Sequence, residues 1–226
     1  MSALRDIELD HVVVAAATLA DGVAWCQEKL GIVPGAGGEH PFMGTHNRIF
    51  GIATARFPKA YFEIIAIDPS AATPKRPRWF GLDDPALQRA LAKGPRLIQW
   101  VARCTDIGAA GEALRARGFD PGAAQQAERQ TPRGVLRWQI TLRADGRRLC
   151  DGALPVLIEW GEVHPSDSLP ESGVALTAAT LGGVVGPFGV ALGAGVAVDR
   201  AGAAPLRIAL QTPRGPVTLD SLRLET

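Results

Sequence analysis

The sequence predicts an α+β protein built from two successive βαβββ modules, and two observations carry this prediction. First, the order strand, helix, strand, strand, strand can be read twice along the 226 residues. Second, LDHVVVAAATLADGVAWCQEKLGI matches LIQWVARCTDIGAAGEALRARGF in pattern and order, which places His11 against Gln99. YFEIIAID matches VLIEWGE, which places Glu63 against Glu159. The separations are 52 residues (11 to 63) and 60 residues (99 to 159), as a duplicated module would give.

The first module follows from local signals. Residues 8–15 are rich in β-branched side chains and predict a strand. A helix is predicted over 18–31, where an N-cap threonine precedes apolar residues at helical spacing and a glycine follows them. A loop at 34–40 leads to two further strand-like runs at 45–55 and 60–68.

The pattern then restarts after a connection. Prolines and aromatic residues interrupt 68–82, and an aspartate caps a short predicted helix that ends at Leu91. The second module is predicted to contain a strand at 96–104, a helix at 105–118, and strands at 134–144 and 154–160.

A partial third copy is expected at the C-terminal end. The run 174–182 is strand-like, and the helix expected after it has decayed into a glycine-rich stretch at 182–195. The predicted organisation is a first module at 1–70, a connection at 71–95, a second module at 96–165 and a degenerate third half-module at 166–226.

Composition excludes several classes of protein. A hydrophobic content of 46% indicates a globular chain, and a net charge of +1 offers no bulk attraction to nucleic acid or to an anionic membrane. The charged N-terminus lacks the apolar core of a signal peptide. Three cysteines without a CxxC spacing fit reduced thiols. We therefore expect a cytoplasmic protein with no nucleic-acid or membrane partner.

Side-chain alternation predicts where chemistry could occur. Leu9, His11 and Val13 are predicted to share one strand face, as are Tyr61, Glu63 and Ile65. If the first and fourth strands of each module are neighbours, His11 and Glu63 point into one concavity. Gln99 and Glu159 then point into it from the second module.

This predicted set favours a divalent metal. Two carboxylates in an apolar trough repel each other and are costly to desolvate, and a cation removes both penalties. Three oxygen donors and one nitrogen donor suit a six-coordinate Ni, Mn, Fe, Mg or Zn ion with two positions left for water or substrate. The ligands would be His11, Glu63, Gln99 and Glu159.

Three segments resemble the vicinal-oxygen-chelate superfamily (glyoxalase, bleomycin resistance and dioxygenase proteins), more narrowly its glyoxalase-like group. They are LDHVVVA, GEHPFMGTHNRIFGI followed by AYFEIIAIDP, and LPVLIEW followed by HPS. The resemblance covers roughly residues 8–224. It implies tandem modules that form a curved mixed β-sheet around a central trough, with helices on the outer face.

The resemblance also implies a metal site, because superfamily sites use His or Gln on the first strand of a module and Glu on the fourth. Here the Gln lies in the second module, which departs from the usual pattern. The GTHN segment borders the pocket in this group, so His46 and Asn47 are expected to contact substrate. Arg137 shares a strand face with Gln139 and is a candidate anion contact, with Trp138 facing the helix.

The expected function is a metal-dependent lyase or isomerase that acts on a small oxygenated metabolite, with Glu159 or Glu63 moving a proton. One alternative is a metal-free, resistance-type binding protein with Trp79, Phe80 and Trp100 around its pocket. A second alternative is an extradiol-type dioxygenase, which normally needs two histidines and one carboxylate. A small-molecule partner is expected in each case, and a homodimer is left open.

Overall fold

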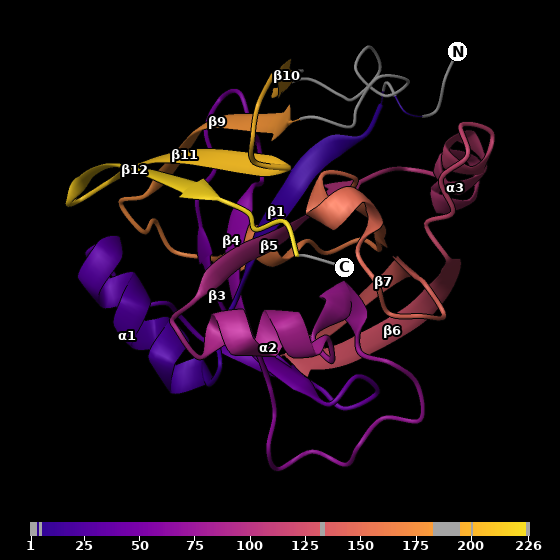
Figure 1. Cartoon of the computed structure of the whole chain (residues 1–226), viewed down its shortest axis with the longest axis horizontal. Helices are drawn as coiled ribbons and strands as arrows, with labels where there is room; N and C mark the ends of the chain where they lie inside the picture. The colour runs from indigo at the N-terminus through magenta and orange to yellow at the C-terminus, as the bar shows by residue number, and fades with distance from the viewer. Residues whose placement is uncertain (1–3, 5, 132–133, 183–194, 200, 225–226) are drawn as a thin grey trace.

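The computed structural model describes residues 4, 6–131, 134–182, 195–199 and 201–224, and it confirms the predicted α+β class (Figure 1). Most strands belong to one curved sheet of eight strands, and a second sheet of four strands packs against it. In Figure 1, helices α1 (Leu19–Lys29) and α3 (Ile107–Arg115) lie at opposite sides of the molecule. None of the described helices is long and apolar enough to cross a membrane.

The first module contains four strands and α1. The strands are β1 (Glu8–Ala15), β2 (Gly37–His40), β3 (Thr45–Gly51) and β4 (Tyr61–Ile67). Strand β1 pairs in parallel with β4, β4 pairs antiparallel with β3, and β3 pairs antiparallel with β2. Thr18 accepts a hydrogen bond from the backbone N–H of Asp21 and caps α1, as predicted.

The second module repeats this arrangement. Its strands are β5 (Arg96–Arg103), β6 (Ala123–Thr131), β7 (Gly134–Leu142) and β8 (Val156–Trp160). Strand β5 pairs in parallel with β8, and β8, β7 and β6 continue antiparallel. Strands β1 and β5 pair antiparallel with each other and join the modules in the order β2-β3-β4-β1-β5-β8-β7-β6. The predicted equivalence of the two first strands is confirmed.

Two strands lie where no strand was predicted. Strand β2 lies inside the predicted loop 34–40, and it forms because its glycines allow close pairing with β3. A Cβ on Gly37 would lie 1.9 Å from the backbone oxygen of Asn47. Strand β6 is a polar edge strand, AAQQAERQT, whose alternating side chains are exposed. Such a sequence carries little of the β-branched and aromatic signal on which strand prediction depends.

The connection and the C-terminal region complete the fold. The connection contains a 3-10 turn, η1 (Trp79–Gly81), and helix α2 (Pro85–Leu91); two further 3-10 turns are η2 (Leu149–Gly152) and η3 (Pro165–Ser168). The small sheet contains β9 (Ala175–Gly182), β10 (Val196–Asp199), β11 (Leu206–Thr212) and β12 (Gly215–Asp220). Its order, β10-β9-β11-β12, differs from that of the modules. Its origin as a third half-module stays a prediction, and residues 183–194 of the glycine-rich stretch lie outside the described residues.

Two hydrophobic clusters lie on opposite faces of the large sheet. The outer cluster joins side chains of the sheet, such as Phe62 and Trp100, to α1, α3 and the small sheet. The inner cluster includes Val13, Trp79 and Ile158 and fills the concave side. The small sheet, drawn in orange to yellow, thus covers part of the outer face (Figure 1). The concave face, where the inner cluster lies, also holds a pocket.

Candidate functional site

A small pocket lies on the concave face between the two modules. Its cavity volume is about 40 Å³, room for only a few water-sized groups. Polar side chains come from β1, β2, β3, β4 and β6, and the remaining side chains are mainly apolar or aromatic. The lining residues are His11, His40, Asn47, Ile49, Tyr61, Glu63, Trp79, Phe80, Arg129, Leu136, Trp138, Ile140, Ile158, Trp160 and Pro165.

A bulge in β1 buries a carboxylate beside this pocket. The β1–β5 register shifts between Leu9 and His11, so Asp10 is the extra residue. Its side chain is fully buried. The shift also corrects the predicted strand face. Leu9 packs in the outer cluster and Val13 in the inner one, so these two side chains do not share a face.

Asp10 holds two imidazole rings. The Nδ1 atom of His11 lies 2.6 Å from one carboxylate oxygen, and the Nε2 atom of His164 lies 2.8 Å from the other. The indole N–H of Trp160 donates to the second oxygen at 3.0 Å. Burial alone would raise the pKa of Asp10, but the hydrogen bonds and charges of His11 and His164 lower it well below the usual range. Asp10 is therefore an ionised acceptor.

The ionised state of Asp10 fixes the tautomer of His11. A carboxylate can only accept hydrogen bonds, so the neutral ring of His11 must carry its proton on Nδ1. The Nε2 atom then has a free lone pair on the pocket side. The ring of Tyr61 stacks on this imidazole with centroids 4.4 Å apart and an interplanar angle of 20°. An acid–base group with a fixed orientation results.

Glu63 is the second acid–base group of the pocket. Its Oε2 atom lies 3.6 Å from Nε2 of His11, too far for a hydrogen bond. Its Oε1 atom accepts a 2.6 Å hydrogen bond from the side-chain amide of Asn47. The amide oxygen of Asn47 accepts from the backbone N–H of Gly38 at 2.8 Å. Asn47 thus holds Glu63 in place, and one carboxylate oxygen stays open to the pocket.

Two further polar side chains stay neutral. Burial raises the pKa of Tyr61 well above its usual value, and the charges of Asp10 and Glu63 raise it further. Burial lowers the pKa of His40 to about 3, and the charge of Arg129 adds to this effect. Tyr61 is therefore a phenol and His40 an uncharged imidazole at neutral pH.

The opposite wall of the pocket has no acid–base group. Strands β7 and β8 contribute Leu136, Trp138, Ile140, Ile158 and Trp160. Among the pocket residues that the structure describes, every carboxylate and imidazole comes from the first module. The two walls therefore differ sharply in chemistry.

The structure brings together three of the predicted site residues, His11, Glu63 and Asn47. It does not bring Glu159 to them. Ile158 and Trp160 face the pocket, so Glu159 faces the outer side, because successive residues of a strand alternate. There its Oε2 atom accepts a 2.8 Å hydrogen bond from the backbone N–H of Ile107 at the start of α3.

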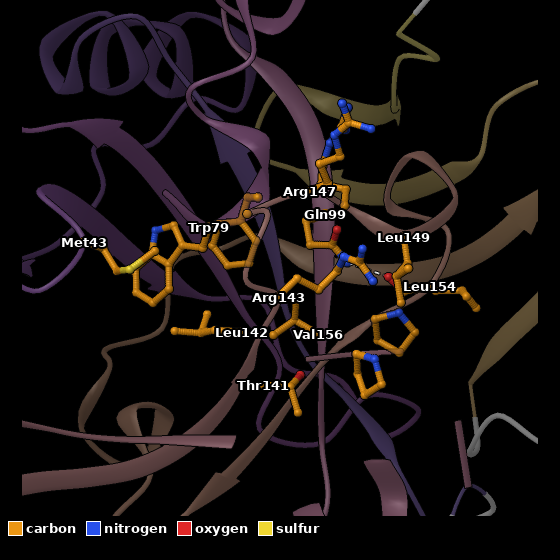
Figure 2. A pocket seen from close by; sticks show the side chains of 15 residues that line it. Met43, Trp79, Gln99, Thr141, Leu142, Arg143, Arg147, Leu149, Leu154 and Val156 are labelled. Carbon is orange, nitrogen blue, oxygen red and sulfur yellow. Dashed lines mark hydrogen bonds between the residues drawn. The ribbon is translucent and has the colours of Figure 1, made fainter. Parts of the chain in front are cut away.

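Gln99 lines a different pocket, shown in Figure 2. Its amide nitrogen donates to the backbone oxygens of Trp100 at 2.9 Å and Leu154 at 2.7 Å. Its amide oxygen is buried without a hydrogen-bond partner among the described residues. Gln99 therefore does not share the pocket of His11.

The other two predicted substrate contacts lie outside the pocket of His11. His46 faces a surface groove with Glu39 and Arg48. Arg137 pairs with Glu128 on the outer side of the β6–β7 hairpin, with Nε and Oε2 3.1 Å apart. Trp138, which was predicted to face the helix, lines the pocket instead, so the two faces of β7 are the reverse of the prediction.

Sequence reasoning assigned no role in the site to Asp10, His40, Arg129 or His164. Strand alternation could not place Asp10, because Asp10 is the extra residue of the bulge in β1. Arg129 lies on the unpredicted strand β6. His164 carried one signal, since it stands directly before Pro165 at the N-cap of a 3-10 turn.

The four predicted metal ligands do not form one site. His11 and Glu63 face each other, but Gln99 and Glu159 lie elsewhere: the amide nitrogen of Gln99 donates to the backbone, and Oε2 of Glu159 accepts from it. Within the described residues, no group of three or more His, Cys, Asp or Glu side chains could hold an ion. Two protein donors are fewer than the three of a typical catalytic zinc site. The observed donor set does not fit the metal centre that the sequence predicted.

Comparison with known proteins identifies related folds. A family model described as a glyoxalase-like domain matches residues 9–184. A hypothetical protein from Staphylococcus aureus superposes with a TM-score of 0.55 at 12% identity, covering 96% of this chain and 87% of that one. A methylmalonyl-CoA epimerase from Mycobacterium tuberculosis gives 0.38 at 19% identity, covering 68% and 86%. A methylmalonyl-CoA epimerase in complex with methylmalonyl-CoA and NH4+ gives 0.41 at 18% identity, covering 70% and 96%. No curated protein matches the sequence.

Proposed function

The chain belongs to the glyoxalase-like domain family, and from this premise we propose that it is an isomerase-type enzyme that moves a proton between neighbouring atoms of a small oxygenated molecule. One observation carries the proposal. The Asp10–His11 pair points Nε2 of His11 at Glu63 across 3.6 Å, and both side chains are buried in the pocket. Paired titratable groups of this kind, buried in a cleft, are typical of sites that transfer protons.

His11 is the proposed base. Its Nε2 atom takes a proton from a carbon next to a carbonyl group, and the electron pair of the broken C–H bond moves to the carbonyl oxygen as an enolate. Asp10 stabilises the imidazolium that forms, because its carboxylate already accepts the Nδ1 proton. The proton then returns to a neighbouring atom of the substrate from His11, or from Glu63 if that carboxylate has received it.

The positions of the two bases favour isomerisation over epimerisation. His11 and Glu63 lie on adjacent parallel strands of one wall, so both approach a bound molecule from the same side. Inversion of a carbon centre by two bases needs them on opposite sides. The opposite wall offers Trp138, Ile158 and other apolar side chains. A transfer along one face of the substrate fits this arrangement.

Exchange of substrate C–H protons with solvent tests the proposal directly. Small compounds with oxygens on neighbouring carbons would be incubated with the protein in D2O, and loss of the C–H signal followed by NMR. We expect catalysed exchange that falls by about 10²–10⁴-fold in His11→Gln. Glu63→Gln should also slow it. EDTA should leave the rate unchanged, because the predicted metal ligands do not converge.

The matched control is His46→Gln, because His46 lies outside the pocket. It should exchange at the wild-type rate, and thermal melts would confirm that all three variants are folded. Binding without exchange by any compound would favour the alternative of a binding protein, for which the aromatic wall of the pocket is suited. Equal loss of exchange in His46→Gln, or complete loss with EDTA, would contradict the proposed mechanism.

A further inference from the structure

An arginine from the second module reaches over the pocket to the first. Arg129 lies on β6, one edge of the large sheet, and Gly38 lies on β2, the other edge. A Cβ atom on Gly38 would lie 1.9 Å from Nη1 of Arg129. The guanidinium group therefore rests against the backbone of β2. It lines both the inner pocket and the groove outside it, which places it at the pocket mouth.

This guanidinium group lacks a protein partner. The side chain of Arg129 forms no hydrogen bond or ion pair with the residues that the structure describes, although its backbone pairs with Leu136 in the β6–β7 hairpin. Other arginines of the second module are engaged: Arg137 pairs with Glu128 and Arg143 with Asp145. The half-buried guanidinium of Arg129 carries five N–H donors in a planar fork, and none of them is a buried donor without a partner, so these donors are left to water or to a ligand.

The carboxylates inside the pocket do not meet this need. Asp10 is engaged by two imidazoles and an indole, and Glu63 by Asn47. Neither forms an ion pair with Arg129. The charge of Arg129 nevertheless reaches the pocket interior, where it contributes to the low pKa of His40. The donors of Arg129 are therefore available to a ligand that replaces water at the pocket mouth.

We propose that Arg129 binds the carboxylate of the substrate and that the substrate is a small 2-oxo acid. This inference rests on the proposed proton-transfer function and names its substrate class. The planar fork of arginine matches the two oxygens of a carboxylate. With the acid group held at the mouth, the neighbouring carbonyl and the next C–H bond extend toward His11. The apolar wall formed by Trp138 and Trp160 receives the hydrocarbon part.

The reaction on such a substrate is keto–enol isomerisation. His11 removes a proton from C3, the C–H electron pair forms the C2–C3 double bond, and the C2 carbonyl electrons move to oxygen. Protonation of that oxygen gives the enol, and the reverse sequence restores the ketone. No oxidant or further reactant is consumed. Arg129 takes no part in the proton transfer, so it sets specificity through charge.

Binding of an acid and its neutral ester tests the role of Arg129. The probes are pyruvate and its methyl ester, with 2-oxobutyrate as a slightly larger acid, and quenching of the pocket tryptophans reports Kd. Wild-type protein is expected to bind pyruvate at least tenfold more tightly than the ester. Arg129→Gln should abolish this preference by weakening the binding of the acid alone, and Arg129→Lys should retain part of the preference.

The matched control is Arg137→Gln, which removes an arginine from the outer face of the same hairpin and should leave both affinities unchanged. If Arg129→Gln weakens the binding of acid and ester equally, Arg129 has only a structural role between the two edges of the sheet, and the inference is wrong. Failure of every acid to bind, or equal binding of acid and ester to the wild type, overturns it as well. His11→Gln should keep the preference while losing exchange. If the protein catalyses proton exchange on neutral carbonyl compounds and shows no preference for acids, the proposed function stands and this inference alone is rejected.

Discussion

Asp10→Asn is the most informative perturbation, because it preserves the shape of the side chain and changes its hydrogen-bonding capacity. Asp10 accepts from His11, His164 and Trp160. An asparagine has one acceptor oxygen and one NH2 donor. The indole of Trp160 can only donate, so the oxygen must stay on that side. The new NH2 group then faces His11 and must donate to its Nδ1 atom, which moves the ring proton to Nε2.

This tautomer switch removes the proposed base, since Nε2 no longer has a lone pair toward the pocket. The expected loss of exchange activity is about 10²–10⁴-fold. Stability should also fall. Hydrogen bonds to a buried charged group contribute roughly 1.5–3 kcal/mol each, and the variant weakens at least one of three. We expect the free energy of unfolding to drop by about 2–4 kcal/mol at neutral pH.

The pH dependence of this loss has a definite sign. The pKa of Asp10 is lower in the folded protein than in the unfolded chain, so its stabilisation is fully present above the unfolded value, about 4. It is lost as the pH falls toward the folded value. The gap in stability between wild type and Asp10→Asn should therefore be largest near pH 7 and shrink below pH 4.

Nitrogen-15 NMR of labelled histidine measures the tautomer without a substrate. The chain has 4 histidines, so the signals can be assigned by single substitutions. Wild-type His11 should show a protonated Nδ1, and Asp10→Asn a protonated Nε2. His164→Phe is the control: it also removes a partner of Asp10 and should cost stability, but it should leave the His11 tautomer and the exchange rate nearly unchanged. A protonated Nε2 on wild-type His11 at neutral pH would refute the reasoning.

Two further predictions concern residues next to and behind the pocket. The pKa of His40 is about 3 in the folded protein, against an ordinary 6.5. Because of this group, the free energy of unfolding should fall by about 1.4 kcal/mol per pH unit as the pH drops below 6.5. Urea unfolding at pH 7 and pH 5 measures the dependence of stability on pH. In His40→Gln this dependence should be weaker by about 1.4 kcal/mol per pH unit. An unchanged slope would mean that His40 is protonated in the folded state. Glu159→Ala removes a partner of the α3 N-terminus and should cost about 1 kcal/mol in a thermal melt without slowing exchange in the pocket. A more than tenfold slower exchange would restore the role that the sequence predicted for Glu159.

The order of elements in both modules could be predicted because its signals are local. Strands β1, β4 and β5 are β-branched or apolar runs, and Thr18 and Asp106 cap the helices that follow the first strands. Strands β2 and β6 could not be predicted, because their glycine-rich and polar sequences carry little strand propensity. Each becomes a strand by pairing with the next strand along the chain, Gly37 with Arg48 and Glu128 with Arg137.

The candidate site could be predicted only where strand alternation is regular. His11 and Glu63 lie on the same face because β1 and β4 pair without a shift from His11 onward. The match of Glu63 with Glu159 was wrong by one position, since Ile158 and Trp160 face the pocket. A shift of one residue turns every side chain of a strand to the other face. Apolar patterns cannot resolve such a shift when both faces are buried, as they largely are in β8.

The two modules therefore do not form a symmetrical site. The first module supplies His11, Glu63 and Asn47, and the second supplies a wall and the support of the base. Trp160 and His164 both bind Asp10, and Asp10 in turn fixes the ring of His11. A base oriented in this way needs both modules to be folded and joined, because its carboxylate is held by side chains 150 and 154 residues away. The second module acts on the proposed chemistry through orientation, while its own counterpart residues, Gln99 and Glu159, form backbone hydrogen bonds away from the acid–base pair.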